Sequence, residues 1–127
     1  MIVGIGVDLA EVDRIRDALE RPATGERFRD RVYTAGEQAY CERRRRKYES
    51  YAARFAAKEA VMKALGRGWS REIGWTEIEV VRERGGRPTI RLHGKTAAYA
   101  TKLGVRTIVL AITHTAETAM AQVIAEK

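Results

Sequence analysis

Cysteine is almost absent from this sequence: Cys41 stands alone among 127 residues, so no disulfide can form within the chain. No apolar run approaches the roughly 20 residues that a membrane-spanning helix needs, and no cysteine–histidine cluster has the spacing of a zinc site. Aromatic residues make up only 7% of the sequence. These absences exclude a disulfide framework, a membrane protein and a zinc-stabilised fold. Because a lone cysteine fits a reducing compartment, we expect a cytoplasmic protein. The first residues, Met1-Ile2-Val3-Gly4, have no basic region, so we expect no secretory signal.

The residues that are present have the composition of one globular domain. Apolar residues account for 45% of the sequence, and a chain of 127 residues leaves room for a single domain, which we place at residues 1–127. Lysine and arginine number 24 against 17 aspartates and glutamates, a net charge of +7. Such an excess predicts a polyanionic partner. Charge alone does not decide among a nucleic acid, an acidic protein and a phosphorylated small molecule.

The stretch RFAAKEAVMKALGRG, from Arg54 to Gly68, organises the rest of the chain. It is rich in strong helix formers, and we expect a helix that begins upstream near Tyr48 and ends at Gly66, a natural C-terminal cap. At about 100° per residue, one stripe of the helix consists of Ala53, Ala56, Ala57, Ala60 and Ala64. We therefore predict that the helix is central and that another element approaches it closely along these alanines.

Glu59 and Lys63 are spaced one helical turn apart, at a place where charge is costly without a partner. One interpretation is a helix-stabilising pair at i, i+4, worth ~0.2–0.5 kcal/mol. The other is a metal-binding carboxylate one turn before a phosphate-binding ammonium, followed at once by the flexible loop at residues 66–68. Spacing alone favours the first interpretation.

The N-terminal segment poses a similar choice for Asp8. A buried strand is predicted at Ile2–Val7, and a helix is predicted at Leu9–Leu19. Asp8 and Glu11 have the spacing of a capping box, so one interpretation is that Asp8 ends the strand and caps the helix. The local sequence leaves a role in a functional site equally open.

The remaining segments predict further helices and then strands. Thr34 resembles an N-cap, with Glu37 three residues on, and it precedes a predicted helix at residues 35–44. The cationic run from Arg43 to Lys47 is typical of a solvated turn between helices. We expect strands at 76–84 and 88–92 joined by a glycine turn, a helix at 95–103, and strands at 106–112 and 119–124. This order predicts an α+β domain.

The charged residues by themselves suit chemistry on a phosphate ester or anhydride. Asp8 and Glu59 come from different elements and supply oxygen ligands of the kind that Mg²⁺ takes, and Lys63, Arg67 and His114 can neutralise phosphates. Three other classes compete: a nucleic-acid-binding module, a magnesium-dependent phosphoesterase that uses the same carboxylates, and a scaffold with incidental charges. The low aromatic content and the lack of a known binding motif argue against the first of these.

The segment Phe55 to Gly68, FAAKEAVMKALGRG, resembles the signature of the phosphopantetheinyl transferases. That signature is F-x-x-K-E-A, with a second lysine four residues after the glutamate and a G-x-G beyond it. The likeness is strongest to the small bacterial type, the holo-acyl-carrier-protein synthase family. Two further motifs agree: Gly6-Val7-Asp8 followed by Arg14, and Thr113-His114-Thr115, before which Ala111 replaces a serine that the family usually carries. Together they extend the resemblance over essentially the whole chain.

The resemblance implies a 4′-phosphopantetheinyl transferase fold, in which a long central helix packs on a small, mainly antiparallel sheet. It also implies a homotrimer whose sites lie between subunits. The implied activity is the Mg²⁺-dependent transfer of 4′-phosphopantetheine from coenzyme A to a serine of apo acyl carrier protein, with adenosine 3′,5′-bisphosphate leaving. The implied pathway is fatty acid biosynthesis, and neither a membrane nor a nucleic acid is expected as a partner.

The resemblance also implies roles for individual residues. Asp8 and Glu59 are the implied magnesium ligands and, with Lys63, the implied catalytic residues; Glu59 or a water on the metal would accept the serine proton. Arg14 and Arg21 are implied to contact the acidic recognition helix of the carrier protein. The residues implied to bind coenzyme A are Lys63, Gly66, Arg87, Pro88, His114, Thr115 and, at the 3′-phosphate, Arg54.

Overall fold

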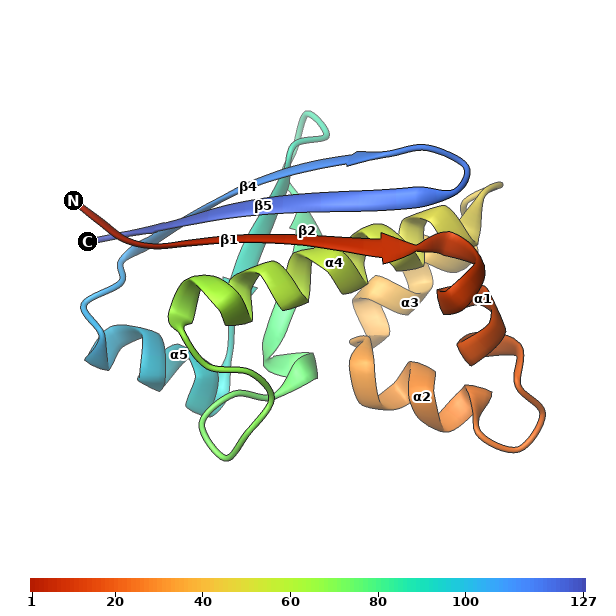
Figure 1. Ribbon diagram of the computed structural model, residues 1–127, viewed down its shortest axis with the longest axis horizontal. Helices are drawn as coiled ribbons and strands as arrows, with labels where there is room; N and C mark the ends of the chain where they lie inside the picture. The colour runs from red at the N-terminus through yellow and green to blue at the C-terminus, as the bar shows by residue number, and fades with distance from the viewer.

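Helix α4 (Lys47–Leu65) runs through the middle of the molecule, and a three-stranded sheet lies along one side of it (Figure 1). The computed structural model describes residues 1–127. Thirteen of the 19 residues of α4 are buried, which confirms the predicted central helix. The helix ends where expected: Gly66 has a φ of 78°, and its N–H donates to the carbonyl of Lys63. This left-handed conformation favours glycine, which has no Cβ to clash.

Two antiparallel sheets surround α4 together with four further helices. The larger sheet has the strand order β1–β5–β4, and a separate hairpin pairs β2 with β3. In Figure 1 the hairpin crosses behind α4, helices α1 to α3 lie near the beginning of α4, and α5 lies toward its other end. This arrangement confirms the predicted α+β class. The elements in chain order are β1 (Ile2–Glu11), α1 (Val12–Glu20), α2 (Gly25–Val32), α3 (Ala35–Glu42), α4, the short 3-10 helix η1 (Trp75–Glu77), β2 (Ile78–Arg82), β3 (Pro88–Leu92), α5 (Gly94–Lys102), β4 (Thr107–His114) and β5 (Thr118–Glu126).

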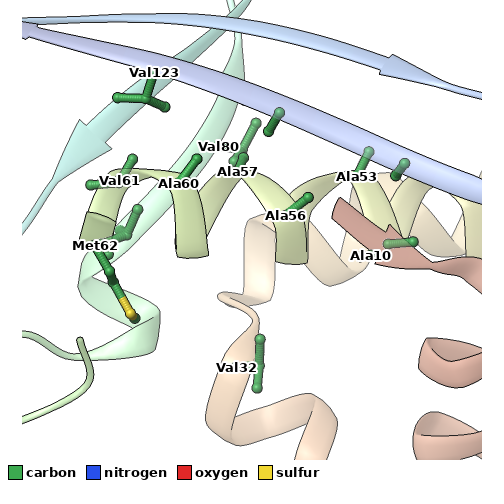
Figure 2. Packing of buried hydrophobic residues seen from close by; sticks show 14 of the residues in the cluster. Ala10, Val32, Ala53, Ala56, Ala57, Ala60, Val61, Met62, Val80 and Val123 are labelled. Atoms are coloured by element: carbon green, nitrogen blue, oxygen red, sulfur yellow. The ribbon is translucent and has the colours of Figure 1, made fainter. Parts of the chain in front are cut away.

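Small residues allow α4 and the sheet to pack closely. A Cβ on Gly6 of β1 would lie 1.8 Å from the carbonyl oxygen of Ala60, and one on Gly4 would lie 1.9 Å from that of Ala64. No side chain fits in such a space, so the backbones of β1 and α4 touch. Figure 2 shows Ala53 and Ala60 projecting from α4 toward the sheet. The close approach predicted from the alanine stripe is therefore confirmed.

Strand β1 is longer than predicted, and this changes the place of Asp8. The strand runs to Glu11, and Asp8 lies within it, opposite Ala121 of β5. Helix α1 begins at Val12, and Glu11 before it makes no side-chain capping bond. The predicted helix from Leu9 with Asp8 as its cap is therefore wrong. A cap contributes about 1 kcal/mol, whereas continuing the ladder with β5 adds several backbone hydrogen bonds of about that size each.

The other local signals are confirmed, with small changes of boundary. Thr34 and Glu37 form the predicted capping box ahead of α3. Gly85 and Gly86, both with positive φ, form the turn between β2 and β3. The first strand of this hairpin is shorter than predicted, because residues 75–77 form a 3-10 turn instead.

The face of the larger sheet that is turned away from α4 is apolar and uncovered in the single chain. Side-chain alternation along β1 leaves Ile5, Val7 and Leu9 exposed by 56%, 45% and 63%. Val109 of β4 and Met120 of β5 are exposed as well. We call these five residues the outer sheet face. Exposed apolar side chains gathered on one face of a sheet are typical of an interaction site. None of the helices has the length and apolar character of a membrane span.

Candidate active site

Charged groups from β1 and α4 meet beside the sheet. The Nζ of Lys63 donates to Asp8 Oδ1 at 2.8 Å and to the carbonyl of Val7 at 3.0 Å. Glu59 lies one turn earlier on α4 and lines the same hollow as Asp8. The extended β1 brings Asp8 to Lys63, so Lys63 forms its direct ion pair with Asp8 and none with Glu59, whose charge acts on it only at longer range. We call Asp8, Glu59 and Lys63 the carboxylate corner.

The electrostatics of the carboxylate corner fit a bound cation. Burial raises the pKa of Glu59, and the negative charge of Asp8 raises it further, against smaller opposite effects of Lys63 and Arg14. The hydrogen bond to Asp8 raises the pKa of Lys63, so this ammonium stays charged. Two carboxylates from different elements are a common protein contribution to a Mg²⁺ site, with phosphate and water completing the coordination. Asp8 and Glu59 are therefore the residues able to hold such an ion.

Two hollows open from the carboxylate corner, and Glu59 belongs to both. The first, of about 600 Å³, combines arginine with apolar side chains, and its lining includes Asp8, Arg14, Arg21, Phe28, Phe55 and Glu59. The second, of about 490 Å³, is lined by Glu59, Met62, Lys63, Gly66, Arg67, Gly68, Trp69 and Trp75. The structure thus brings four other predicted site residues to the carboxylates: Arg14, Arg21, Lys63 and Gly66.

A third hollow, of about 400 Å³, lies on another side of α4 and is dominated by arginine. Its lining consists of Tyr40, Arg43, Arg44, Arg45, Arg46, Glu49, Ser50, Ala53, Arg54, Arg82, Pro88, Ile112 and His114. Arg54 and Glu59 are five residues apart in the sequence, which separates them by about 140° around the axis at about 100° per residue. We call this third site the arginine hollow. It faces a different direction from the carboxylate corner.

Arg54 is the most unusual group in the arginine hollow. It is only 4% exposed and forms no ion pair with a carboxylate. Its Nε is the one buried side-chain nitrogen or oxygen that has no hydrogen-bond partner. A buried guanidinium without a counter-ion is costly, because the hydrogen bonds to water that its Nε has lost are not replaced. The site is therefore suited to an anion that enters from solvent.

The predicted residues of the C-terminal half are only partly brought together. His114, at the end of β4, lines the arginine hollow with Pro88, and its Nδ1 lies 3.0 Å from Glu49 Oε1. Arg87 lies in the exposed hairpin turn. Thr115 lies in the turn between β4 and β5, where its Oγ1 accepts hydrogen bonds from two backbone N–H groups. Arg87 and Thr115 line none of the three hollows of a single chain.

Comparison with known protein families identifies the family of the chain that carries the carboxylate corner and the arginine hollow. A family model described as the 4′-phosphopantetheinyl transferase superfamily matches residues 4–121. The chain belongs to this superfamily. Two relatives named holo-acyl-carrier-protein synthase match nearly the whole of this chain over nearly their own full length. The relative from Solibacter usitatus is 59% identical over 126 residues, and that from Koribacter versatilis is 48% identical over 126 residues, with 99% of each chain covered in both cases.

Solved structures of phosphopantetheinyl transferases share the fold. The crystal structure of the holo-acyl-carrier-protein synthase from Neisseria meningitidis has a TM-score of 0.90 at 28% identity, covering 100% of both chains. The enzyme from Bacillus anthracis, described in complex with CoA (3′,5′-ADP), has a TM-score of 0.80 at 34% identity and covers 98% of this chain and 96% of its own. The enzyme from Helicobacter pylori, described in complex with coenzyme A, has a TM-score of 0.84 at 27% identity, covering 96% of this chain and 99% of its own.

One part of the candidate site of this transferase is not predicted from the sequence. The run Arg43–Arg46 is exposed, as a solvated turn would be, but it also lines the arginine hollow. A signal was present: Ser50 and Arg54 are four residues apart on one side of α4, and Arg46 precedes Ser50 by the same interval as the N-cap of that helix. The side chains that α3 and β2 contribute to the hollow carry no comparable local signal.

Proposed function

We propose that the chain transfers 4′-phosphopantetheine from coenzyme A to a serine of an apo acyl carrier protein. Adenosine 3′,5′-bisphosphate leaves, Mg²⁺ is required, and the holo product serves fatty acid biosynthesis in the cytoplasm. The proposal is supported by full-length relatives named holo-acyl-carrier-protein synthase. It is also supported by similar structures described as complexes with coenzyme A or its nucleotide part.

The observation that carries the proposal is the unpaired guanidinium of Arg54 in the arginine hollow. Coenzyme A bears a 3′-phosphate and a pyrophosphate, and a doubly charged phosphate is a strong partner for guanidinium groups. Arg54 is preorganised by burial, and its Nε still lacks an acceptor. His114 and Pro88 line the same hollow. We therefore assign the nucleotide end of coenzyme A, and its 3′-phosphate in particular, to this hollow.

The carboxylate corner is assigned to the reaction itself. The serine oxygen of the carrier attacks the β-phosphorus of the pyrophosphate, the bond from that phosphorus to the bridging oxygen breaks, and adenosine 3′,5′-bisphosphate departs. Asp8 and Glu59 hold Mg²⁺, which when bound neutralises charge on the pyrophosphate. Lys63 contacts the phosphates and stabilises the charge of the leaving group. The serine proton passes to Glu59 or to a water beside it. Arg14, with Arg21 in the same hollow, attracts the acidic carrier.

A homotrimer with shared sites is supported by two features of the single chain. The first is the outer sheet face, which is apolar and uncovered. The second is the angle of about 140° between Arg54 and Glu59 around α4, because it turns the two ends of the site away from each other. A coenzyme A that lies between subunits can meet the arginine hollow of one chain and the carboxylate corner of a neighbour. Arg87 and Thr115, which line no hollow in one chain, are exposed and free to contact such a ligand.

The decisive experiment is mass spectrometry of an apo acyl carrier protein incubated with this protein, coenzyme A and Mg²⁺. We expect the carrier to gain one phosphopantetheinyl group, and the gain should disappear with EDTA or when the carrier serine is replaced by alanine. Hydrolysis of coenzyme A without transfer would favour a phosphoesterase instead. Absence of transfer together with tight, salt-sensitive DNA binding in a gel-shift assay would favour a nucleic-acid-binding module.

The shared-site arrangement is tested by complementation. Lys63→Ala and His114→Ala should each be nearly inactive alone. When the two variants are co-expressed, mixed trimers should contain some sites with both residues intact, and part of the activity should return. Two differently tagged chains, purified in sequence, show that mixed assemblies have formed. If these assemblies exist and stay inactive, each site is built within one chain.

A further inference from the structure

Tyr40 of α3 lies at the centre of the cations that line the arginine hollow. The guanidinium carbon of Arg54 is 4.0 Å from the centroid of its ring, that of Arg44 is 5.4 Å away, and that of Arg82 is 5.5 Å away. The three arginines come from different elements: α4, the turn between α3 and α4, and the end of β2. A single aromatic ring therefore contacts cations from three separate parts of the chain.

This arrangement needs a physical cause, because three like charges close together repel one another. None of Arg44, Arg54 and Arg82 forms an ion pair with a carboxylate. The face of an aromatic ring is electron-rich and attracts cations, and guanidinium groups in particular. The hydroxyl of Tyr40 makes no hydrogen bond within the chain, so the ring is the part of the side chain that acts on the arginines.

We propose that Tyr40 is a positioning residue that gathers Arg44, Arg54 and Arg82 around one phosphomonoester and so makes the chain select coenzyme A over dephospho-coenzyme A. This inference rests on the proposed function. The pyrophosphate is assigned to Lys63 and the carboxylate corner, which leaves the 3′-phosphate as the anion for the three arginines. A ribose hydroxyl in its place would leave the buried charge of Arg54 uncompensated, and a site built for a charged group discriminates strongly against an analogue that lacks it.

Two of the three arginines depend on the ring for their position. Arg44 and Arg82 are exposed, and long exposed side chains sample many rotamers unless a contact restricts them. Arg82 is restricted in addition by a hydrogen bond that it donates to the carbonyl of Gly86 in the hairpin turn. Without the ring, repulsion would drive Arg44 and Arg82 away from Arg54 into solvent. Binding of the phosphate would then be weaker, because it would have to order both side chains against their repulsion.

The test compares coenzyme A with dephospho-coenzyme A as substrates of the wild-type enzyme and of Tyr40 variants. Tyr40→Leu and Tyr40→Met remove the aromatic face, and we expect each to raise the KM for coenzyme A by about tenfold, a size within the range of cation–π contacts. The kcat should fall much less, and the KM for dephospho-coenzyme A should hardly change. Tyr40→Phe keeps the ring and should keep the preference for coenzyme A.

Tyr48→Leu is the matched control. Tyr48 also has a cation over its ring, with the Nζ of Lys47 at 5.2 Å, but it lies outside the arginine hollow. In this variant, the ratio of the activity with coenzyme A to the activity with dephospho-coenzyme A should be the same as in the wild type. Because the ratio is measured within each protein, a partial loss of folded enzyme lowers both activities and leaves the ratio unchanged.

The outcomes separate this inference from the proposed function. If the wild type transfers no phosphopantetheine, the proposed function fails and the inference fails with it. Suppose that the wild type is active and that both aliphatic variants keep the preference for coenzyme A, or lose activity with both substrates equally. Tyr40 then only packs the fold, and the inference alone is overturned. If Tyr40→Phe loses the preference as fully as Tyr40→Leu, the ring is not the cause and the proposal is wrong.

Discussion

Arg54 and Lys58 lie one turn apart on α4 and are both buried, but their surroundings differ completely. The side chain of Lys58 is 0% exposed, and its Nζ donates to Glu37 Oε1 at 2.8 Å and to the carbonyls of Trp75 and Ile78. Arg54 has no carboxylate partner, and its Nε has no acceptor. Burial alone therefore does not distinguish a charge that is satisfied within the fold from one that still lacks partners. The distinction lies in which hydrogen-bonding groups are already satisfied within the chain.

Glu37 is the reason that Lys58 is tolerated in the core. Its carboxylate accepts the N–H of Thr34 at 2.9 Å and that of Val80 at 2.8 Å in addition to the ammonium of Lys58. Burial lowers the pKa of Lys58, and the charge and hydrogen bond of Glu37 oppose this shift. The pair connects α3, α4 and β2 without any need for a ligand. In the arginine hollow, in contrast, Glu49 pairs with Arg46 and His114, and Arg54 is left without a carboxylate partner.

The largest effect is expected where a ligand-binding charge is removed without loss of the fold. Glu59→Gln should lower turnover ~10³-fold, equivalent to ~4 kcal/mol of transition-state stabilisation, because an amide is a poor substitute for a carboxylate on Mg²⁺. Asp8→Asn should behave in the same way. Turnover is measured across a Mg²⁺ titration, and urea unfolding checks the fold. Near wild-type turnover of Glu59→Gln at saturating Mg²⁺ would remove Glu59 from the metal site.

The next largest effect is expected on the free energy of unfolding, when Lys58 loses its buried partner Glu37. Glu37→Gln should lower the free energy of unfolding by about 3 kcal/mol, because it leaves the fully buried ammonium of Lys58 without a counter-charge. Urea denaturation followed by tryptophan fluorescence measures the loss. The double variant Glu37→Leu with Lys58→Met should recover part of the loss, since it removes both charges. A loss for Glu37→Gln below about 1 kcal/mol, the usual range of an exposed pair, would contradict the structural role.

Arg54→Met should weaken substrate binding and leave stability intact, whereas Glu37→Gln should lower stability. It should raise the KM for coenzyme A roughly thirtyfold, or about 2 kcal/mol, the scale of a hydrogen bond to a charged group. The ligand-free protein should be as stable as the wild type or more stable, because the substitution removes an uncompensated buried charge. Initial rates and urea unfolding are measured on the same preparation. A loss of stability as large as that of Glu37→Gln would mean that Arg54 belongs to the scaffold after all.

The smallest effect is expected at the rim of the site. Arg14→Glu should raise the KM for the carrier protein about fivefold and leave that for coenzyme A unchanged, since a docking charge acts mainly on encounter and orientation. The difference should shrink at high salt. Arg16→Glu is the matched control, because Arg16 lies on the same helix but pairs with Asp13 and lines no hollow at the carboxylate corner. Equal effects of the two variants would indicate a general charge effect and exclude specific docking by Arg14.

Much of the fold could be predicted because its signals are local. The helix formers before Gly66, the capping box of Thr34 and Glu37, and the paired glycines of the hairpin act over a few residues each. Glu59, Lys63 and Gly66 also lie within two helical turns, so the sequence places them near one another. For Asp8 and His114, whose local patterns are those of a helix cap and a strand end, the resemblance to a family made the expected roles specific.

Only the tertiary structure decided how the charges are partnered. The place of Asp8 depends on β5, which lies more than 100 residues later in the chain and pairs with β1. This pairing extends β1 past Asp8, so the capping pattern of Asp8 and Glu11 is not used. Lys58 and Arg54 look alike in sequence, and their difference rests on Glu37 and on Tyr40, which lie on α3. The physical reason is that the cost of burying a charge is set by every group that surrounds it. Those groups come from elements that are distant in the sequence.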